Sequence, residues 1–190
     1  MPNLPYADVD QLGEMLRQSP FPEDTPPGNV FRMLAQTPRV GAAALGLIYA
    51  VLGQANLDPC LREIVILRVA ERSAAPYAFA QHAAIAASVG VTEAQRTALE
   101  TGQAPSELFD ELERAALAFA DQILDQPGVS AETFARLHQQ LSARQIVELL
   151  LTAGCFRMMS RLVTVFELEL EPAYGVEALR KAHIQRTRAS

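Results

Sequence analysis

Hydrophobic positions along the chain recur every three or four residues, as in amphipathic helices, and no segment alternates with the two-residue period of a strand. Asp58 before Pro59 is typical of a helix start, and Gly90 of a helix end. Capping-box patterns begin at Thr92 and at Ser142. The pattern predicts short helices over residues 11–17 and after Thr92 and Ser130. It predicts further helices over residues 29–37, 38–54, 60–72, 76–89, 107–125 and 142–167.

The chain of 190 residues is long enough for one domain with a sizeable core, and its hydrophobic fraction of 49% suits such a domain. Residues 1–27 contain six prolines and are interpreted as an arm that wraps the domain or a neighbouring subunit. We assign residues 28–173 to the helical domain and 174–190 to a C-terminal tail. The expected fold class is an all-α, single-domain helical bundle.

Charge and cysteine content limit the kinds of molecule that the protein could bind and the compartment in which we expect it. The net charge of −6, without a stripe of Lys and Arg, argues against a nucleic-acid partner. Residues 40–57 carry no charge, but glycines and polar residues interrupt them, so we expect a buried core or interface helix and no membrane span. The first ten residues lack the pattern of a secretory leader. Cys60 and Cys155 make no disulfide framework, which favours a cytoplasmic protein with inert, buried thiols.

Glu63 lies in the middle of an apolar stripe of its expected helix. At about 100° per residue, Ile66, Leu67 and Ala70 fall within about 60° of it. An ionised carboxylate among apolar neighbours is costly unless it is paired. Glu63 is therefore either a structural carboxylate that pairs with an arginine or caps a helix, or a functional one.

His82 occupies a similar face, on which Ala75, Ala78 and Phe79 are candidate pocket-lining residues. A histidine in this setting is either a satisfied core residue or a functional one, and the small side chains leave room for a ligand. If the two helices pack on these faces, Glu63 and His82 meet in a dry pocket. Such a carboxylate–imidazole pair is suited to proton transfer near neutral pH.

Two further residues are weaker candidates. Tyr77 precedes His82 by five residues, about 140° around a regular helix, and reaches the same pocket only if the first turn is distorted. Otherwise it is a partly buried tyrosine. Arg157, one turn before Arg161, could hold a substrate carboxylate, although ion pairs at a subunit contact are the alternative. His138 and His183 belong to no metal-ligand pattern, so we expect no metal site.

Three segments resemble the carboxymuconolactone decarboxylase superfamily, on its alkylhydroperoxidase D-like side: residues 58–70 (DPCLREIVILRVA), residues 77–82 (YAFAQH) and the turn at residues 86–93. The resemblance is specific over residues 58–95 and weaker over 29–38 and 109–171. It implies an all-α fold and a homo-oligomer, commonly a trimer or hexamer. It also places Glu63 and His82 at the acidic and histidine positions of the family.

One departure from the family pattern affects the expected activity. The alkylhydroperoxidase members carry a CxxC motif whose cysteines would fall at Ala75 and Ala78, and Tyr77 stands where they have a further histidine. Peroxide reduction through a disulfide needs two neighbouring thiols. Cys60 and Cys155 are not placed for this, so we expect thiol peroxidase activity to be absent.

The resemblance then points to the decarboxylase branch, whose enzymes use no metal or organic cofactor. It implies a cofactor-free acid/base enzyme acting on a small organic acid or lactone, with His82 as proton donor or shuttle, Glu63 orienting it and Tyr77 as an auxiliary donor. One alternative is an oligomeric helical protein that binds a ligand or partner without turnover. A thiol oxidoreductase is the other, and it would need an exposed, reactive cysteine.

Overall fold

The computed structural model describes residues 2–22, 25–26 and 28–172, and all regular secondary structure in this part of the chain is helical. The expected all-α fold class is thereby confirmed. The proposed tail at 174–190 lies outside the described residues. The helices are α1 (Val9–Arg17), α2 (Asn29–Leu34), α3 (Pro38–Gly53), α4 (Pro59–Arg72), α5 (Pro76–Ser88), α6 (Glu93–Glu100), α7 (Glu111–Asp125), α8 (Ala131–His138) and α9 (Ala143–Val165).

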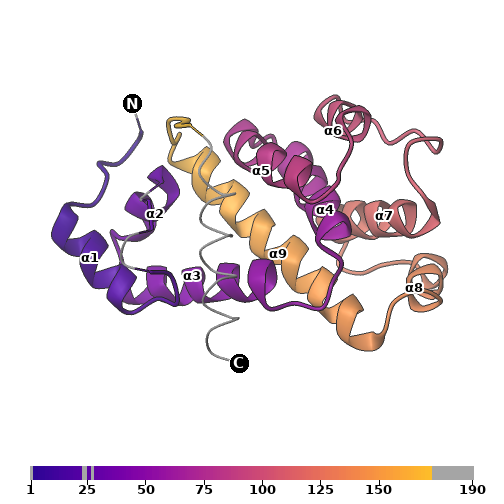
Figure 1. Ribbon diagram of the computed structural model, residues 1–190, viewed down its shortest axis with the longest axis horizontal. Helices are drawn as coiled ribbons and strands as arrows, with labels where there is room; N and C mark the ends of the chain where they lie inside the picture. Colours follow the sequence, from indigo (N-terminus) through magenta and orange to yellow (C-terminus); the bar gives the residue numbers. More distant parts are fainter. Residues whose placement is uncertain (1, 23–24, 27, 173–190) are drawn as a thin grey trace.

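Helix α4 is the centre of the bundle and packs against α5, α7 and α9. Four consecutive residues of α4, Ile64, Val65, Ile66 and Leu67, have no exposed surface, so this helix is covered on every side. Figure 1 shows α9 running diagonally through the middle of the view, with α1 and α2 on one side and α6, α7 and α8 on the other. The site residues of α4 and α5 therefore lie in the interior.

The caps read from the sequence form as expected. The Asp58 carboxylate accepts a hydrogen bond from the Leu61 N–H at 3.0 Å and opens α4. Thr92 and Ser142 each form a capping box with the glutamine three residues later. Each cap satisfies backbone N–H groups that a helix start leaves without partners.

Several predicted boundaries are wrong by a few residues. The helix expected from residue 107 begins at Glu111, because Asp110 and Glu113 form a capping box there. The helix expected over 29–37 ends at Leu34, and residues 35–37 form a turn that leads into Pro38. In each case a local hydrogen-bonded feature sets the helix boundary, a capping box at the start of α7 and a turn at the end of α2, and the helix is shorter than the hydrophobic pattern.

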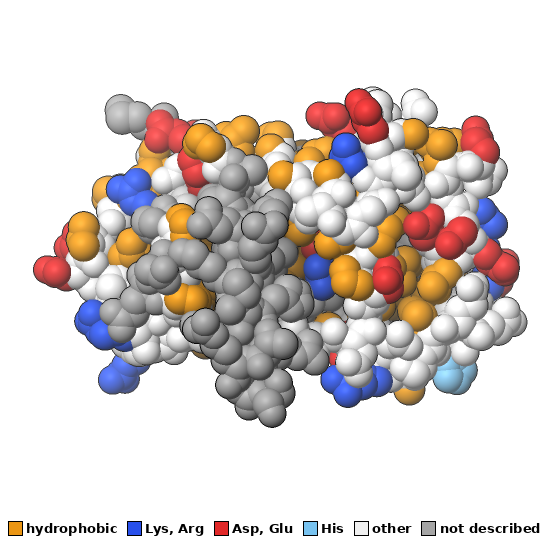
Figure 2. All heavy atoms as spheres, viewed as in Figure 1, with side chains coloured by type: hydrophobic (Ala, Val, Ile, Leu, Met, Phe, Trp, Pro, Cys, Tyr) orange, Lys and Arg blue, Asp and Glu red, His pale blue; other side chains and the backbone are white. Residues whose placement is uncertain are grey.

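The N-terminal segment packs on its own domain. Helix α1 lies against α3, and Met15 and Phe21 from this segment belong to the main core. Helix α3, which carries no charge after Arg39, buries Leu45 and Leu52 in the same core. Among the described helices, none has the combined length and apolar character to cross a membrane. Figure 2 shows Lys and Arg side chains in separate groups on the visible face, with acidic side chains between and around them.

Candidate active site

A buried chain of hydrogen-bonded polar side chains links α4 to α5. The His82 Nδ1 lies 2.9 Å from the Glu63 Oε2, and the Arg62 Nε donates to the Glu63 Oε1 at 3.1 Å. Glu63 is 0% exposed and His82 is 9% exposed. The Arg62 Nη1 also donates to the Leu52 carbonyl oxygen at 2.8 Å. Both carboxylate oxygens of Glu63 are therefore used, as a buried carboxylate requires.

This arrangement combines the two readings that the sequence left open for Glu63. The carboxylate does pair with an arginine, its immediate neighbour Arg62, and it also contacts His82. The apolar stripe of α4 packs against the small-residue face of α5, and this packing brings the two residues together. The sequence analysis overlooked Arg62, although its position beside a buried acid was a usable signal.

The contact with Glu63 fixes which nitrogen of a neutral imidazole carries the proton. In the neutral ring, the Nδ1–H donates to the Glu63 carboxylate, which is an acceptor only. The Nε2 of His82 is then the unprotonated nitrogen. The His82 ring also packs in a T-shaped arrangement with the Phe156 ring, with ring centroids 4.6 Å apart.

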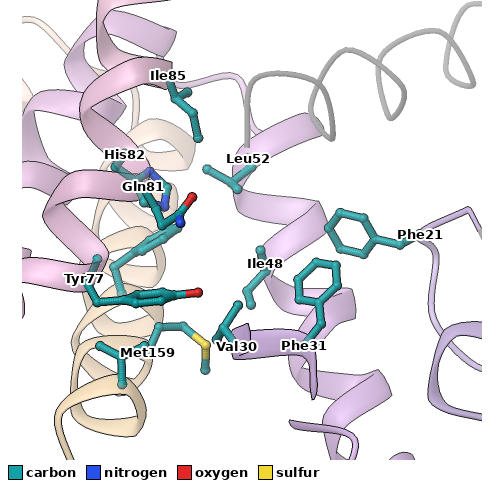
Figure 3. Close-up of a pocket in the computed structure, with 13 residues that line it drawn as sticks. Phe21, Val30, Phe31, Ile48, Leu52, Tyr77, Gln81, His82, Ile85 and Met159 are labelled. Carbon is teal, nitrogen blue, oxygen red and sulfur yellow. The ribbon is translucent and has the colours of Figure 1, made fainter. Parts of the chain in front are cut away.

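His82 forms part of the wall of an apolar cavity of about 100 Å³ between α3, α5 and α9. This volume is about two-thirds of that of a roughly 150 Å³ apolar cavity that binds benzene. Figure 3 shows Tyr77, Gln81 and His82 on one side of it, on α5, and Phe21 and Phe31 opposite. The complete wall consists of Phe21, Val30, Phe31, Ile48, Leu52, Tyr77, Ala78, Gln81, His82, Ile85, Phe156, Met159 and Val163.

Tyr77 reaches this cavity, but its hydroxyl points to another carboxylate. The Tyr77 hydroxyl donates to the Glu171 Oε1 at 2.6 Å, and the Asn29 N–H donates to the same oxygen at 2.8 Å. The Gln81 Nε2 donates to the Glu171 carbonyl oxygen at 3.0 Å. Glu171 thus ties the end of the described chain to α2 and α5. No local sequence signal identified Glu171 or Gln81.

The remaining predicted site residues lie in different places. Ala78 lines the cavity, whereas Ala75 and Phe79 line a separate surface groove on the other side of α5. Arg157 lies away from the cavity wall, and its Nη1 donates to the Ser73 hydroxyl at 2.7 Å. Burial and the neighbouring Arg161 lower the pKa of Arg157. The side of α5 that lines the cavity includes Tyr77 and Gln81, so it is rotated away from Ala75 and Phe79 relative to the face expected from a helical wheel.

Neither thiol lines the cavity. Burial raises the pKa of Cys155 on α9 to about 11. Burial, followed by the charges of Glu113 and Asp58, raises the pKa of the half-buried Cys60. Within the described ranges, no three His, Cys, Asp or Glu side chains gather in a way that could hold a metal ion.

Comparison with known proteins supports the fold. No protein-family model matches the sequence, and no curated protein matches it. Among solved structures, an alkylhydroperoxidase AhpD core, a peroxidase-related protein from Ralstonia eutropha JMP134, is 16% identical, with 96% of each chain covered and a TM-score of 0.73. A peroxidase-related protein from Silicibacter sp. TM1040 is 18% identical, with 90% of this chain and 92% of that chain covered and a TM-score of 0.72.

A third similar structure is described as a debrominase, Bmp8. It is 20% identical, with 95% of this chain and 96% of that chain covered and a TM-score of 0.69. These structural similarities show that the chain has the alkylhydroperoxidase D-like fold. The family resemblance expected from the sequence is confirmed at the level of the fold.

Proposed function

We propose that the protein is a cofactor-free acid/base enzyme in which His82 transfers a proton to or from a small organic substrate in the cavity. The observation that carries this proposal is the position of His82 between a fully buried carboxylate and an apolar, ligand-sized space. An imidazole held by a carboxylate on one nitrogen can exchange a proton through the other.

The proposal takes His82 to be neutral before the substrate reacts, and this sets the order of the proton transfers. A neutral His82 first accepts a proton at Nε2 from the substrate, and the electron pair of the broken bond stays on the substrate. Glu63 then stabilises the imidazolium through Nδ1, and Arg62 keeps Glu63 ionised and oriented. The imidazolium returns the proton at a second position. Glu63 acts here as a positioning residue, because it touches His82 and does not line the cavity.

The substrate class follows from the family resemblance and the size of the cavity. We favour a small organic acid or lactone, with proton transfer at a carbon next to a carbonyl group. In a decarboxylating variant, the His82 Nε2 would first take the carboxylic acid proton of the substrate. The carbon–carbon bond would then break with release of carbon dioxide, its electron pair would stay on the substrate carbon, and the imidazolium would return the proton to that carbon. One similar structure, a variant of the debrominase, is described in complex with 2,3,4-tribromopyrrole. It is 20% identical with a TM-score of 0.62, covers 92% of this chain and 90% of that chain, and supports a ring-sized ligand for this fold.

Tyr77 keeps a secondary role in this proposal. Its hydroxyl proton goes to Glu171, so it would act on substrate only after that hydrogen bond is broken. A thiol oxidoreductase is disfavoured, because both thiols have raised pKa values and lie outside the cavity wall.

A homo-oligomer, trimeric or hexameric, also belongs to the proposal. Exposed apolar side chains on α9, including Val147, Leu151 and Met158, support it.

The experiment is a screen of small lactones and keto acids in deuterated water, with turnover and deuterium incorporation followed by NMR. For a compound that reacts, we expect His82→Gln to lower kcat by about 10²-fold or more. Glu63→Gln should lower kcat more than it changes KM. The matched control is His138→Gln, which alters an exposed histidine on α8.

Two outcomes would contradict the proposal. The first is a reaction that proceeds at the wild-type rate in His82→Gln, because the proton would then travel by another group. The second is the absence of both turnover and exchange for compounds that bind in the cavity. That result would favour the alternative of a binding protein without catalytic activity.

A further inference from the structure

Gln81 presents an unsatisfied hydrogen-bond acceptor at the cavity wall. The side chain lies on α5 beside His82, is 7% exposed and contributes to the cavity lining. Its Oε1 is buried and has no hydrogen-bond partner in the described part of the chain. A buried acceptor without a donor is costly, so the position of this oxygen calls for an explanation.

The hydrogen bond of the Gln81 Nε2 fixes the orientation of the side-chain amide. The Nε2 donates to the backbone carbonyl oxygen of Glu171 at 3.0 Å. A carbonyl can only accept, so exchanging the nitrogen and oxygen would place two acceptors against each other. The atom left for the cavity is therefore the carbonyl oxygen of the amide and not its NH₂ group.

The other polar groups of this wall also offer acceptors. The Nε2 of neutral His82 is unprotonated, because the Nδ1 carries the proton toward Glu63. The Tyr77 hydroxyl proton is donated to Glu171. The Arg62 guanidinium is outside the cavity lining and is engaged by Glu63 and the Leu52 carbonyl. Among the described lining residues, there is no Lys or Arg to face an anion.

We propose that the cavity selects a neutral, ring-sized molecule that donates an O–H or N–H hydrogen bond to the Gln81 Oε1. Gln81 is then a specificity-determining residue. This inference rests on the proposed function in one respect, since it takes the cavity occupant to be the substrate. Within the proposed substrates, it selects a neutral hydroxylated lactone or enol over a carboxylate anion.

The first test compares three probes that share one ring: phenol, toluene and benzoate. Phenol is a neutral donor, toluene has no polar group and benzoate is an anionic acceptor. We expect phenol to bind wild-type protein at least as tightly as toluene and about tenfold more tightly than benzoate, measured by NMR titration at pH 7.5. Tightest binding of benzoate, or no binding of any probe, would overturn the proposal.

The second test assigns the preference to Gln81. Gln81→Met keeps the side-chain length and removes the acceptor. We expect the ratio of the toluene Kd to the phenol Kd to fall about tenfold in this variant. Gln139→Met, at an exposed position after α8, is the control and should leave the ratio unchanged. An unchanged ratio in a folded Gln81→Met protein would overturn the assignment, and the order of the wild-type probes decides the matter if that variant does not fold.

These measurements separate this inference from the proposed function, because neither requires turnover. If His82→Gln leaves every reaction unaffected, the proposed function fails while the phenol preference stands. If the donor preference is absent but His82→Gln abolishes turnover, the inference about Gln81 fails and the acid/base role stands.

Discussion

Glu63 is a carboxylate without any contact with water, held between a guanidinium and an imidazole. Replacing it with leucine keeps much of the volume but leaves Arg62 and His82 without their common acceptor. Removing one member of a buried ionic group typically costs about 3–5 kcal/mol. We therefore expect Glu63→Leu to lower the free energy of unfolding by about this amount, measured by urea denaturation.

The comparison for this prediction is Glu132→Leu, at an exposed position in the first turn of α8. A surface change of this kind should alter the free energy of unfolding by about 0.5 kcal/mol or less. Equal effects of the two substitutions would show that Glu63 is not energetically coupled to the interior, contrary to the proposed triad.

The two cysteines should be unreactive in the folded protein. With a pKa of about 11, the Cys155 thiol is ionised in about one molecule in a thousand at pH 8. The raised pKa of Cys60 also slows its reaction. We expect a disulfide reagent to modify the single-thiol variant Cys60→Ala at least about 100-fold more slowly when folded than when unfolded in guanidinium. Rapid modification of native Cys155 would revive the thiol oxidoreductase hypothesis.

At the scale of residues, the sequence predicted the contact between Glu63 and His82 but not the residues that surround the two side chains. The apolar faces around Glu63 and His82 predicted that the two would meet if their helices packed on these faces, and the two side chains lie 2.9 Å apart. Glu171 could not be found in this way. It lies 90 positions beyond Gln81, and its position depends on how the chain turns after α9. Long-range backbone paths of this kind leave no periodic signal.

At the scale of elements, two glycines of α3 provide a matched pair. A Cβ at Gly41 would lie 2.5 Å from the Leu34 carbonyl oxygen and 2.7 Å from the Met15 Sδ, whereas a Cβ at Gly46 meets nothing within 4 Å. Gly41→Ala should therefore destabilise the protein by about 1–3 kcal/mol by separating α3 from α1 and α2. Gly46→Ala should stabilise it by about 0.5–1 kcal/mol, since alanine favours helix.

The measurement is urea denaturation of both variants, followed by circular dichroism at the helix band. Both positions lie inside the same helix, so intrinsic helix propensity cancels in the comparison. A Gly41→Ala variant as stable as Gly46→Ala would contradict the close approach of α1 and α2 to α3.

Element positions were predictable from the sequence and element ends less so. Side chains that cap backbone N–H groups, such as Asp58 and Ser142, fixed helix starts within one residue. The start of α7 was missed because the Asp110 capping box was not recognised in an acidic stretch. Helix α9 ends at Val165, two residues earlier than expected, and Glu167 there adopts a positive φ of 51°.

At the scale of the molecule, helical periodicity gave the fold class, and the motif around Glu63 and His82 gave the family resemblance. Identities of 16–20% with structures of the same fold show that the fold is shared while most residues differ. The cavity was not predictable in full. Phe21 comes from the N-terminal segment and Phe156 from α9, and only the packing of distant segments brings them to His82.

The central claim is that His82 offers an unprotonated Nε2 to the cavity while Glu63 holds its Nδ1. The most direct test is ¹⁵N NMR of the imidazole nitrogens in histidine-labelled protein, with His82 assigned through the His82→Gln variant. For the neutral ring, we expect the proton on Nδ1, and we expect the Nε2 signal to shift when a ligand enters the cavity. A neutral His82 with its proton on Nε2, or an Nε2 signal unaffected by bound ligand, would contradict the account.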